Sequence, residues 1–487
     1  MATITLTELA DGKIIQRSGV VGSISIAGTQ TGATSIQARV VLHGTSTEVV
    51  SWTTIDSTPS ASWSGVISDV PQGGWYNIQV RVGNEPATTA NSTRKLGIGM
   101  LIGCTGQSNM DYWFRDGSSY TPNSTVRMYS TGAELPNALT WSWRTVTGDG
   151  AVTFCNILND AIGIPIGILD TAPGACGIVA QVNDYPPAPT NGHWMDLTAG
   201  EPYPVFKTAV AAVGGYLEAI LHVAGEAEAA RGISAATFIA TDSVTKGCGY
   251  FYESRLRVDV GNGSSFPNLP IFVAYLGAWN NTTDPNFWSV DSPAEWQTIR
   301  DAQKYLIGTI PDVHHMSVQI DLPYKADGLY IHHTTAGYAT MATRSAQAVL
   351  HKLGYQSYSV GPIISSMRQS AANEVVINIT PEAGTDFTPT TGITGFTILD
   401  SGVAETITSA VRNSADTIKL TIAGTITGTL SARYGYGVAV NDTYPVKDNS
   451  AITLPLNSNG NIGLSGTGFT RLAVNNLGKS LFKECSL

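Results

Sequence analysis

The segment Gly106-Gln107-Ser108-Asn109-Met110 follows an apolar run over residues 100–104 and contains a serine that could act as a nucleophile. The run predicts a buried strand, and ligands bind at the carboxyl edge of parallel α/β sheets. Gly106 permits a tight turn there, and the amides after the turn could face a developing oxyanion. Ser108 is therefore a candidate nucleophile. An ordinary strand-to-loop turn with a polar serine would explain the local residues equally well.

A serine hydroxyl becomes nucleophilic when a base accepts its proton, and a second segment could supply that base. The stretch Asp327-Gly328-Leu329-Tyr330-Ile331-His332-His333 precedes a predicted helix that opens around residues 334–338. Imidazole titrates in the useful pH range, and an upstream carboxylate can orient it. The hypothesis gives these roles to His332 and Asp327. The plain alternative is a helix start with two surface histidines.

Two further segments combine a predicted strand end with glycine. In the first, Gly174 or Gly177 could offer a backbone amide to the oxyanion, whereas a loop glycine more often only meets a need for positive φ. In the second, Glu226 could contact substrate or support the site from behind. A solvated helix surface is the simpler interpretation of Glu226 and Glu228, and the segment alone favours it.

The elements that would position these residues predict an α/β fold over residues 97–355. Short apolar runs indicate buried strands, and stretches with helical spacing separate them. The predicted strands cover residues 100–104, 162–169, 237–240 and 271–276. The predicted helices cover residues 206–217, 294–307 and 336–353. Buried strands that alternate with helices are typical of a layered α/β domain with a mainly parallel sheet.

Two β regions flank this part of the chain. Residues 1–96 carry alternating or β-branched runs separated by Gly and Pro turns, which predicts a β-sandwich-like domain. Residues 356–487 indicate a second β domain that ends in a Gly/Asn-rich tail. The length of 487 residues also suggests about three domains.

Composition and charge exclude several classes of function. Charged residues make up only 13% of the chain, the formal net charge is −10, and there is no Lys/Arg run, so we expect no nucleic-acid partner. The five cysteines are widely spaced and lack a CxxC pair, so neither a zinc site nor a disulfide framework is expected. No apolar run has the length of a signal peptide or a membrane span, and we expect no membrane partner.

Together and in this order, the segments resemble the sialate O-acetylesterase family of SGNH hydrolases, which are carbohydrate acetylesterases. Gly106-Gln107-Ser108-Asn109-Met110 is similar to the nucleophile block of that family, and residues 167–174 are similar to its second block. Gly225-Glu226 falls where the family has its third block, and His332 is similar to the histidine of its last block. The resemblance extends over most of residues 60–456 and includes the β modules on both sides.

The resemblance implies a central three-layer α/β/α domain of the SGNH type between two β-sandwich-like domains. It implies a serine acyl-enzyme mechanism without a metal or cofactor, in which the amides of Ser108 and Gly174 hold the oxyanion. It also implies an acetylated oligosaccharide or polysaccharide as substrate. We expect four side chains to contact it: Gln107, Asn109, Glu226 and Trp113. Four further aromatic residues could stack on sugar faces: Tyr112, Trp194, Trp279 and Trp288. At least half of these candidates are expected to lie in the core instead.

Three positions depart from the pattern of that family. Ala224 stands where the family has Gln, and Cys176 interrupts the Gly-Gly pattern of the second block. Asp327 lies five residues before the histidine instead of three, so Asp321 is a rival for the orienting acid, and a Ser–His dyad is a third arrangement. His333 is a rival base.

Other functions stay open as alternatives. The low charge and the flanking β regions resemble phage tailspikes and adhesins, so one alternative is a non-enzymatic carbohydrate-binding tail-fibre module. A virion-borne deacetylase of bacterial surface polysaccharide would combine both ideas. An esterase for lipid or aryl esters is another alternative, although no large apolar lid helix is evident. The expected location is extracellular or virion-associated, and a tailspike would be a homotrimer, although no coiled-coil heptads are found.

Overall fold

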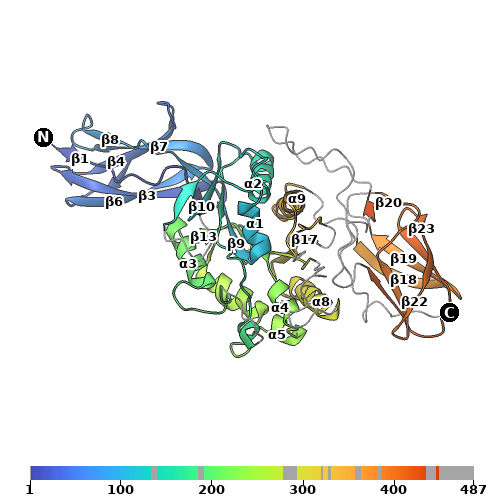
Figure 1. Ribbon diagram of the computed structural model, residues 1–487. Coiled ribbons are helices and arrows are strands. Elements are labelled where there is room, and N and C mark those ends of the chain that lie inside the picture. Colours follow the sequence, from blue (N-terminus) through green and yellow to red (C-terminus); the bar gives the residue numbers. More distant parts are fainter. Residues whose placement is uncertain are drawn as a thin grey trace.

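The computed structural model describes residues 2–132, 140–184, 191–277, 293–319, 322–326, 331–356, 363–380, 385–434 and 446–448. Figure 1 shows an N-terminal group of strands, a central body of strands and helices, and a C-terminal group of strands. The predicted combination of a central α/β fold with β sheets on either side is confirmed at this level.

The N-terminal strands form two layers around one apolar core. One layer has the strand order β1-β3-β6, and the other contains β2, β4, β5, β7 and β8. Along β3, buried and exposed residues alternate, because successive side chains of a strand point to opposite faces. The buried faces contribute Ile24, Trp63 and Val80 to the core. The strands are β1 (Thr3–Ile4), β2 (Lys13–Gln16), β3 (Val21–Thr31), β4 (Ile36–Leu42), β5 (Glu48–Asp56), β6 (Ser62–Pro71), β7 (Gly73–Val82) and β8 (Thr89–Asn91).

Strand β9 (Leu96–Gly106) joins the N-terminal strands to the central sheet. Its first half pairs with β2 and β7, and its second half pairs with β12 and β14. Every residue of β9 is buried, as expected for an apolar run that is covered on both faces. The domain boundary predicted between residues 96 and 97 therefore falls at the start of a strand that both parts share.

The central sheet has the strand order β11-β10-β12-β9-β14-β16-β17. All neighbours in it are parallel except β10 and β11. On one face, Met100 and Ile102 of β9 pack with residues of α2 and α9. On the other face, Leu101 packs with residues of α3 and α8, so helices cover the sheet on both sides. The other strands are β10 (Val126–Ser130), β11 (Ser142–Arg144), β12 (Ile166–Leu169), β14 (Ala219–Val223), β16 (Ile271–Ala274) and β17 (Val313–Ser317).

The helices of the central body follow the strands around the sheet. The two long helices predicted near residues 294–307 and 336–353 are confirmed as α8 and α9. A short parallel pair, β13 (Tyr216–Leu217) and β15 (Gly261–Asn262), lies beside the main sheet. The helices are α1 (Ser108–Arg115), α2 (Asp149–Ile162), α3 (Pro202–Val213), α4 (Glu226–Ala230), α5 (Ala235–Ile239), α6 (Cys248–Tyr250), α7 (Arg257–Asp259), α8 (Pro293–Thr309) and α9 (Thr335–Lys352), with a 3₁₀ turn η1 (Ala180–Asp184) and a π turn η2 (Phe251–Leu256).

The strand predicted over residues 237–240 is wrong, because this run belongs to α5. The hydroxyl of Ser234 accepts a hydrogen bond from the backbone N–H of Thr237 at 3.1 Å and so begins the helix. Phe238 is buried in the core on the inner face of α5. An apolar run of four residues fits a buried strand and a short buried helix equally well, and only the cap distinguishes them.

The C-terminal strands form a separate antiparallel unit with its own core. One sheet has the order β18-β19-β24-β23, and a second has the order β22-β21-β25. Buried side chains such as Ile377, Ile398 and Leu420 fill the space between them. The strands are β18 (Ile363–Ala371), β19 (Glu374–Thr380), β20 (Phe387–Thr388), β21 (Phe396–Asp400), β22 (Val403–Glu405), β23 (Ile407–Ser414), β24 (Thr417–Ile422), β25 (Leu430–Tyr434) and β26 (Lys447–Asp448).

Candidate active site

The turn from β9 into α1 places Ser108 at the carboxyl edge of the central sheet. Gly106 ends the strand with φ of +136°, and a Cβ atom there would lie 2.0 Å from the carbonyl oxygen of Val223. Only glycine fits this position, because both the backbone conformation and the close contact exclude a side chain. Gln107 then adopts an extended conformation, and Ser108 is the first residue of the helix.

Ser108 and His332 meet at this edge although 224 positions separate them. The Oγ atom of Ser108 lies 3.0 Å from Nε2 of His332, and both side chains are half-buried. The histidine lies three residues before α9. The start of the helix is set by Thr334, whose hydroxyl accepts a hydrogen bond from the backbone N–H of Gly337 at 3.2 Å. A hydroxyl that can donate to an imidazole nitrogen is the geometry that proton abstraction from a serine requires.

The neighbouring histidine has different surroundings. His333 is fully buried, and its Nε2 lies 2.9 Å from Oε1 of Gln319. Burial lowers the pKa of His333 to about 3, so its ring stays neutral at physiological pH. His333 is thus engaged by Gln319 and not by the candidate nucleophile. Both candidate acids, Asp327 and Asp321, lie outside the residues that the structure describes.

A buried hydrogen-bond network connects α1, which begins with Ser108, to residues 331–333, which we call the histidine loop. The amide nitrogen of Asn109 donates to Oε1 of Glu226 at 2.6 Å and to the carbonyl of Ile331 at 3.2 Å. The hydroxyl of Tyr338 donates to Oδ1 of Asn109 at 2.9 Å and accepts from the backbone N–H of His333 at 3.3 Å. The network therefore holds Ser108, which precedes Asn109, in register with the histidine loop.

Three side chains expected to contact substrate are buried instead. Gln107, Asn109 and Glu226 are exposed by 5%, 1% and 2%. The side-chain oxygen of Gln107 lies 3.4 Å from the backbone nitrogens of Gly225 and Ala227, which donate to it. These side chains act as supports of the site, and their burial contradicts the expected direct contact with a sugar.

The loop after β12 closes the other side of the nucleophile turn. The thiol of Cys176 lies 3.2 Å from the carbonyl oxygen of Gly106, and the indole nitrogen of Trp194 donates to the same oxygen at 2.8 Å. Cys176, which departs from the pattern of the resembling family, thus has a structural contact of its own. Gly174 is buried in this loop. In the part of the chain that the structure describes, the backbone N–H groups of Ser108 and Gly174 have no hydrogen-bond acceptor.

Glu228 holds this loop from behind, a role that the sequence did not suggest. It is fully buried, so the interpretation of Glu226 and Glu228 as a solvated helix surface is wrong. One carboxylate oxygen of Glu228 accepts from the backbone N–H groups of Ile178 and Val179, at 2.5 and 3.2 Å. Such bonds stabilise the charged form, whereas burial, the larger effect, raises the pKa of Glu228.

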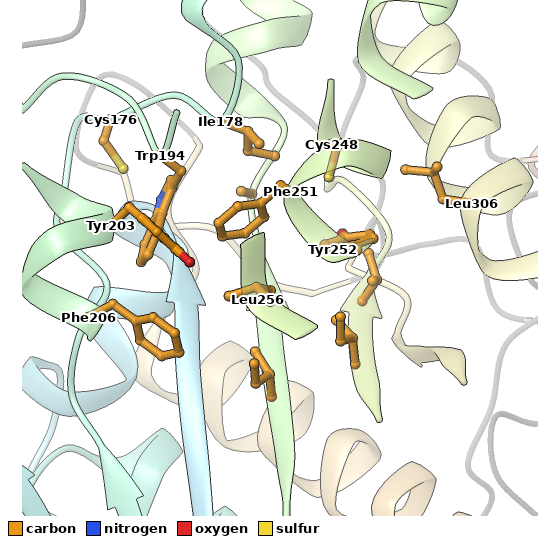
Figure 2. Packing of buried hydrophobic residues seen from close by; sticks show 14 of the residues in the cluster. Cys176, Ile178, Trp194, Tyr203, Phe206, Cys248, Phe251, Tyr252, Leu256 and Leu306 are labelled. Atoms are coloured by element: carbon orange, nitrogen blue, oxygen red, sulfur yellow. The ribbon is translucent and has the colours of Figure 1, made fainter. Parts of the chain in front are cut away.

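The aromatic residues separate into core and site. Trp113 is fully buried with its ring 5.9 Å from that of Phe154, so it is not available to a sugar as expected. Trp194 is also in the core, and Figure 2 shows it beside Phe206 and Phe251. Tyr112 is half-buried, with its ring centre 4.7 Å from that of the half-buried His332. Trp279 and Trp288 lie outside the described residues.

Within the described ranges, no group of three or more His, Cys, Asp or Glu side chains could hold a metal ion. The same ranges contain no helix that is long and apolar enough to cross a membrane.

The buried carboxyl of Glu226 leads to a prediction about stability. Burial raises the pKa of Glu226 to about 7, so the folded protein binds a proton here that the unfolded chain releases at lower pH. Stability should then fall as the pH rises from about 4.5 to about 7, because ionising the buried group becomes a growing cost. Glu226→Gln keeps an oxygen for Asn109 and removes this cost. Its melting temperature at pH 8 should exceed that of the wild type by roughly 2–4 °C per kcal/mol of cost removed.

Thermal unfolding of both proteins between pH 5 and 8.5 measures this difference. Glu226→Ala is the matched control, because it also removes the ionisable group but leaves the Asn109 amide without its acceptor. It should be less stable than Glu226→Gln by about 1–3 kcal/mol at every pH. Parallel pH profiles for the wild type and Glu226→Gln would contradict the assignment.

Comparison with known proteins agrees with this fold. No family model matches the chain, and no curated protein matches its sequence. A solved carbohydrate acetylesterase from Xanthomonas citri is 16% identical with a TM-score of 0.57, over 91% of this chain and 96% of that one. A carbohydrate acetylesterase from Sinorhizobium meliloti is 12% identical with a TM-score of 0.31, over 52% of this chain and 100% of that one. The first of these shows that the chain shares its fold with a solved esterase over most of its length.

Proposed function

We propose that this protein is a serine esterase that removes O-acetyl groups from carbohydrate. The observation that carries the proposal is the 3.0 Å contact between Ser108 Oγ and His332 Nε2 at the carboxyl edge of a parallel sheet. Among the residues that the structure describes, the backbone N–H groups of Ser108 and Gly174 have no acceptor, and we assign them to the oxyanion. The esterase fold shared with a carbohydrate acetylesterase supports the choice of substrate.

In the proposed reaction, Ser108 Oγ attacks the acetyl carbonyl carbon while Nε2 of His332 takes the hydroxyl proton. The oxyanion of the tetrahedral intermediate accepts hydrogen bonds from the amides of Ser108 and Gly174. The intermediate then expels the sugar oxygen, which receives the proton from His332, and leaves an acetyl ester on Ser108. Water attacks this ester with His332 again as base, and acetate departs.

The acid that orients His332 is part of the proposal. Asp327 is the first candidate and Asp321 the second, and the pair could also act as a dyad. A carboxylate on Nδ1 would keep the proton there and leave Nε2 free to accept from the serine. The setting proposed for this activity is extracellular or virion-associated, where the flanking β sheets and the low charge suit contact with bacterial surface polysaccharide.

A substrate series tests the proposed function. Near Ser108, the side chain of Asn109 donates to Glu226, and that of Gln107 accepts from the backbone N–H groups of Gly225 and Ala227. These polar groups offer little apolar area to a long acyl chain. We expect acetate release from acetylated xylan, and kcat/KM for p-nitrophenyl acetate to exceed that for the octanoate at least about tenfold. A fluorophosphonate should stop both reactions and label Ser108 in mass spectra of the digested protein. Labelling without any ester hydrolysis, or a preference for the octanoate, would contradict the proposal.

A further inference from the structure

A cavity lies at the opposite end of β9 from the candidate active site, where the N-terminal strands meet the central body. It has a volume of about 490 Å³, within the ~300–1,000 Å³ typical of small-molecule sites. Residues of β2 and β3 form one wall, and the end of α3 with β13 and β15 forms the other. Figure 1 shows β3, β13 and α3 approaching one another at this junction.

The wall from β2 presents a lysine that forms no ion pair with a described carboxylate. Lys13 and Ile15 line the cavity, whereas Ile14 between them points into the core. Lys13 is half-buried, and no described carboxylate forms an ion pair with it. Burial lowers the pKa of Lys13, which is the effect of removing an ammonium group from water without compensation. An anion in the cavity would supply that compensation.

The second cation of the wall is already neutralised. A guanidinium nitrogen of Arg17 lies 3.3 Å from the buried carboxylate of Glu218, and another donates to Oε1 of Gln72 at 2.7 Å. Lys13 is therefore the charge that a ligand would meet. It stands out because the chain as a whole carries a formal net charge of −10 and would otherwise repel anions.

The remaining lining suits a sugar ring. Tyr216, at the start of β13, lines the cavity and is 56% exposed, so that part of its aromatic ring is accessible to a ligand. The hydroxyls of Ser23 and Ser25 lie on the exposed face of β3, where Ile24 points inward. In the part of the chain that the structure describes, neither hydroxyl has a hydrogen-bond partner. An aromatic face, free hydroxyls and one cation together fit a pyranose that carries a carboxylate.

We propose that this cavity binds a carboxylate-bearing sugar unit, so that an acidic polysaccharide is held at one edge of the sheet while its acetyl ester is cleaved at the other. Cleavage at the other edge rests on the proposed esterase function, whereas binding of the sugar in the cavity does not. Strand β9 connects the two places, since Lys13 pairs with Leu96 and Ser108 follows Gly106. Ten residues of strand span roughly 30 Å, so only a polymer could occupy both sites.

Direct binding tests the cavity independently of catalysis. Calorimetric titration of the full chain uses methyl β-D-glucuronide, methyl β-D-glucoside and sodium acetate. Comparing the three affinities shows what the carboxylate and the sugar ring each contribute to binding. The glucuronide should bind about tenfold more tightly than either comparison ligand, because a charged hydrogen bond and the ring contacts act together. Lys13→Met should lower its affinity to that of the glucoside, and Tyr216→Ala should weaken both sugars. Lys419→Met and Tyr305→Ala, which change the same residue types elsewhere, should bind like the wild type.

Kinetics then connect the cavity to the polymer. On O-acetylated polygalacturonate, Lys13→Met should raise KM several-fold with kcat unchanged, while acetylated glucomannan and p-nitrophenyl acetate should be hydrolysed as by the wild type. The cavity proposal would be overturned if the glucuronide bound no more tightly than the glucoside or than acetate. It would also be overturned if the glucuronide did not bind. A failure of the esterase proposal would look different. The wild type would not hydrolyse p-nitrophenyl acetate, but the binding titrations would still test the cavity.

Discussion

Ser108→Ala is expected to reduce kcat for acetate release by roughly 10⁵-fold or more, because it removes the atom that forms the acetyl ester. The hydroxyl contacts His332 at 3.0 Å, and the side chain is half-buried at the first position of α1. Alanine favours helix, so the fold should be retained. Steady-state rates with p-nitrophenyl acetate and acetylated xylan, together with a melting curve of each protein, measure both effects.

A matched control is available at another helix start. Ser234 precedes α5, and its hydroxyl accepts from the backbone N–H of Thr237 at 3.1 Å. Ser234→Ala should lower stability by about 1 kcal/mol, as cap removal commonly does, and should leave the esterase rate unchanged. Ser108→Ala should thus lose activity and keep its melting temperature, whereas Ser234→Ala should lose stability and keep its activity. If Ser108→Ala keeps more than a few per cent of the activity at a normal melting temperature, another nucleophile performs the reaction.

The parts of the site that could be predicted from sequence are those set by short stretches of chain. An apolar run followed by Gly106 indicates a strand that ends in a tight turn, and the structure has β9 and a glycine with φ of +136° there. Likewise, the helical spacing after residue 335 indicated α9, which places His332 at a helix start. Each inference depended on neighbours a few positions away, where pattern and conformation are directly linked.

The contacts that could not be predicted join distant segments. Glu228 looked solvated because two glutamates in a short helix usually face water, yet its partners are the amides of Ile178 and Val179, about 50 positions earlier. Nothing in the local pattern reports such a pairing. A weak signal was present in Ala227, Ala229 and Ala230, because a helix that has apolar residues on all sides is more often buried than exposed.

Aromatic residues show a related limit. Trp113 and Trp194 were both candidates for a sugar-binding surface, and both are fully buried. A tryptophan has the same sequence signature in a core and at a binding face, since both environments use its apolar area. The indole nitrogen of Trp194 does reach the site, but as a donor to the carbonyl of Gly106. Its position follows from packing with Phe206 and Phe251, which lie on other elements.

His332→Gln is expected to cost nearly as much activity as Ser108→Ala, roughly 10⁴–10⁶-fold in kcat, because a nucleophile and its base act as one unit. For the same reason, the double variant should be no slower than either single variant. In the wild type, kcat/KM should fall at acid pH, where a protonated imidazole cannot accept the serine proton. The residual activity of His332→Gln should lack this acid limb. Initial rates from pH 5 to 9 with p-nitrophenyl acetate measure both expectations.

His333→Gln is the decisive comparison, because it changes the same residue type one position along the chain. The buried ring of His333 contacts Gln319 at 2.9 Å, and burial holds its pKa at about 3, so it does not titrate in the measured range. This variant should lose stability, keep the acid limb and lose less than about tenfold in rate, since it disturbs only the support of the loop. Asp327→Asn and Asp321→Asn, measured in the same way, identify the orienting acid by the larger loss. If His333→Gln removed the acid limb and His332→Gln preserved it, the roles of the two histidines would be reversed and the base would have to approach Ser108 from within the core.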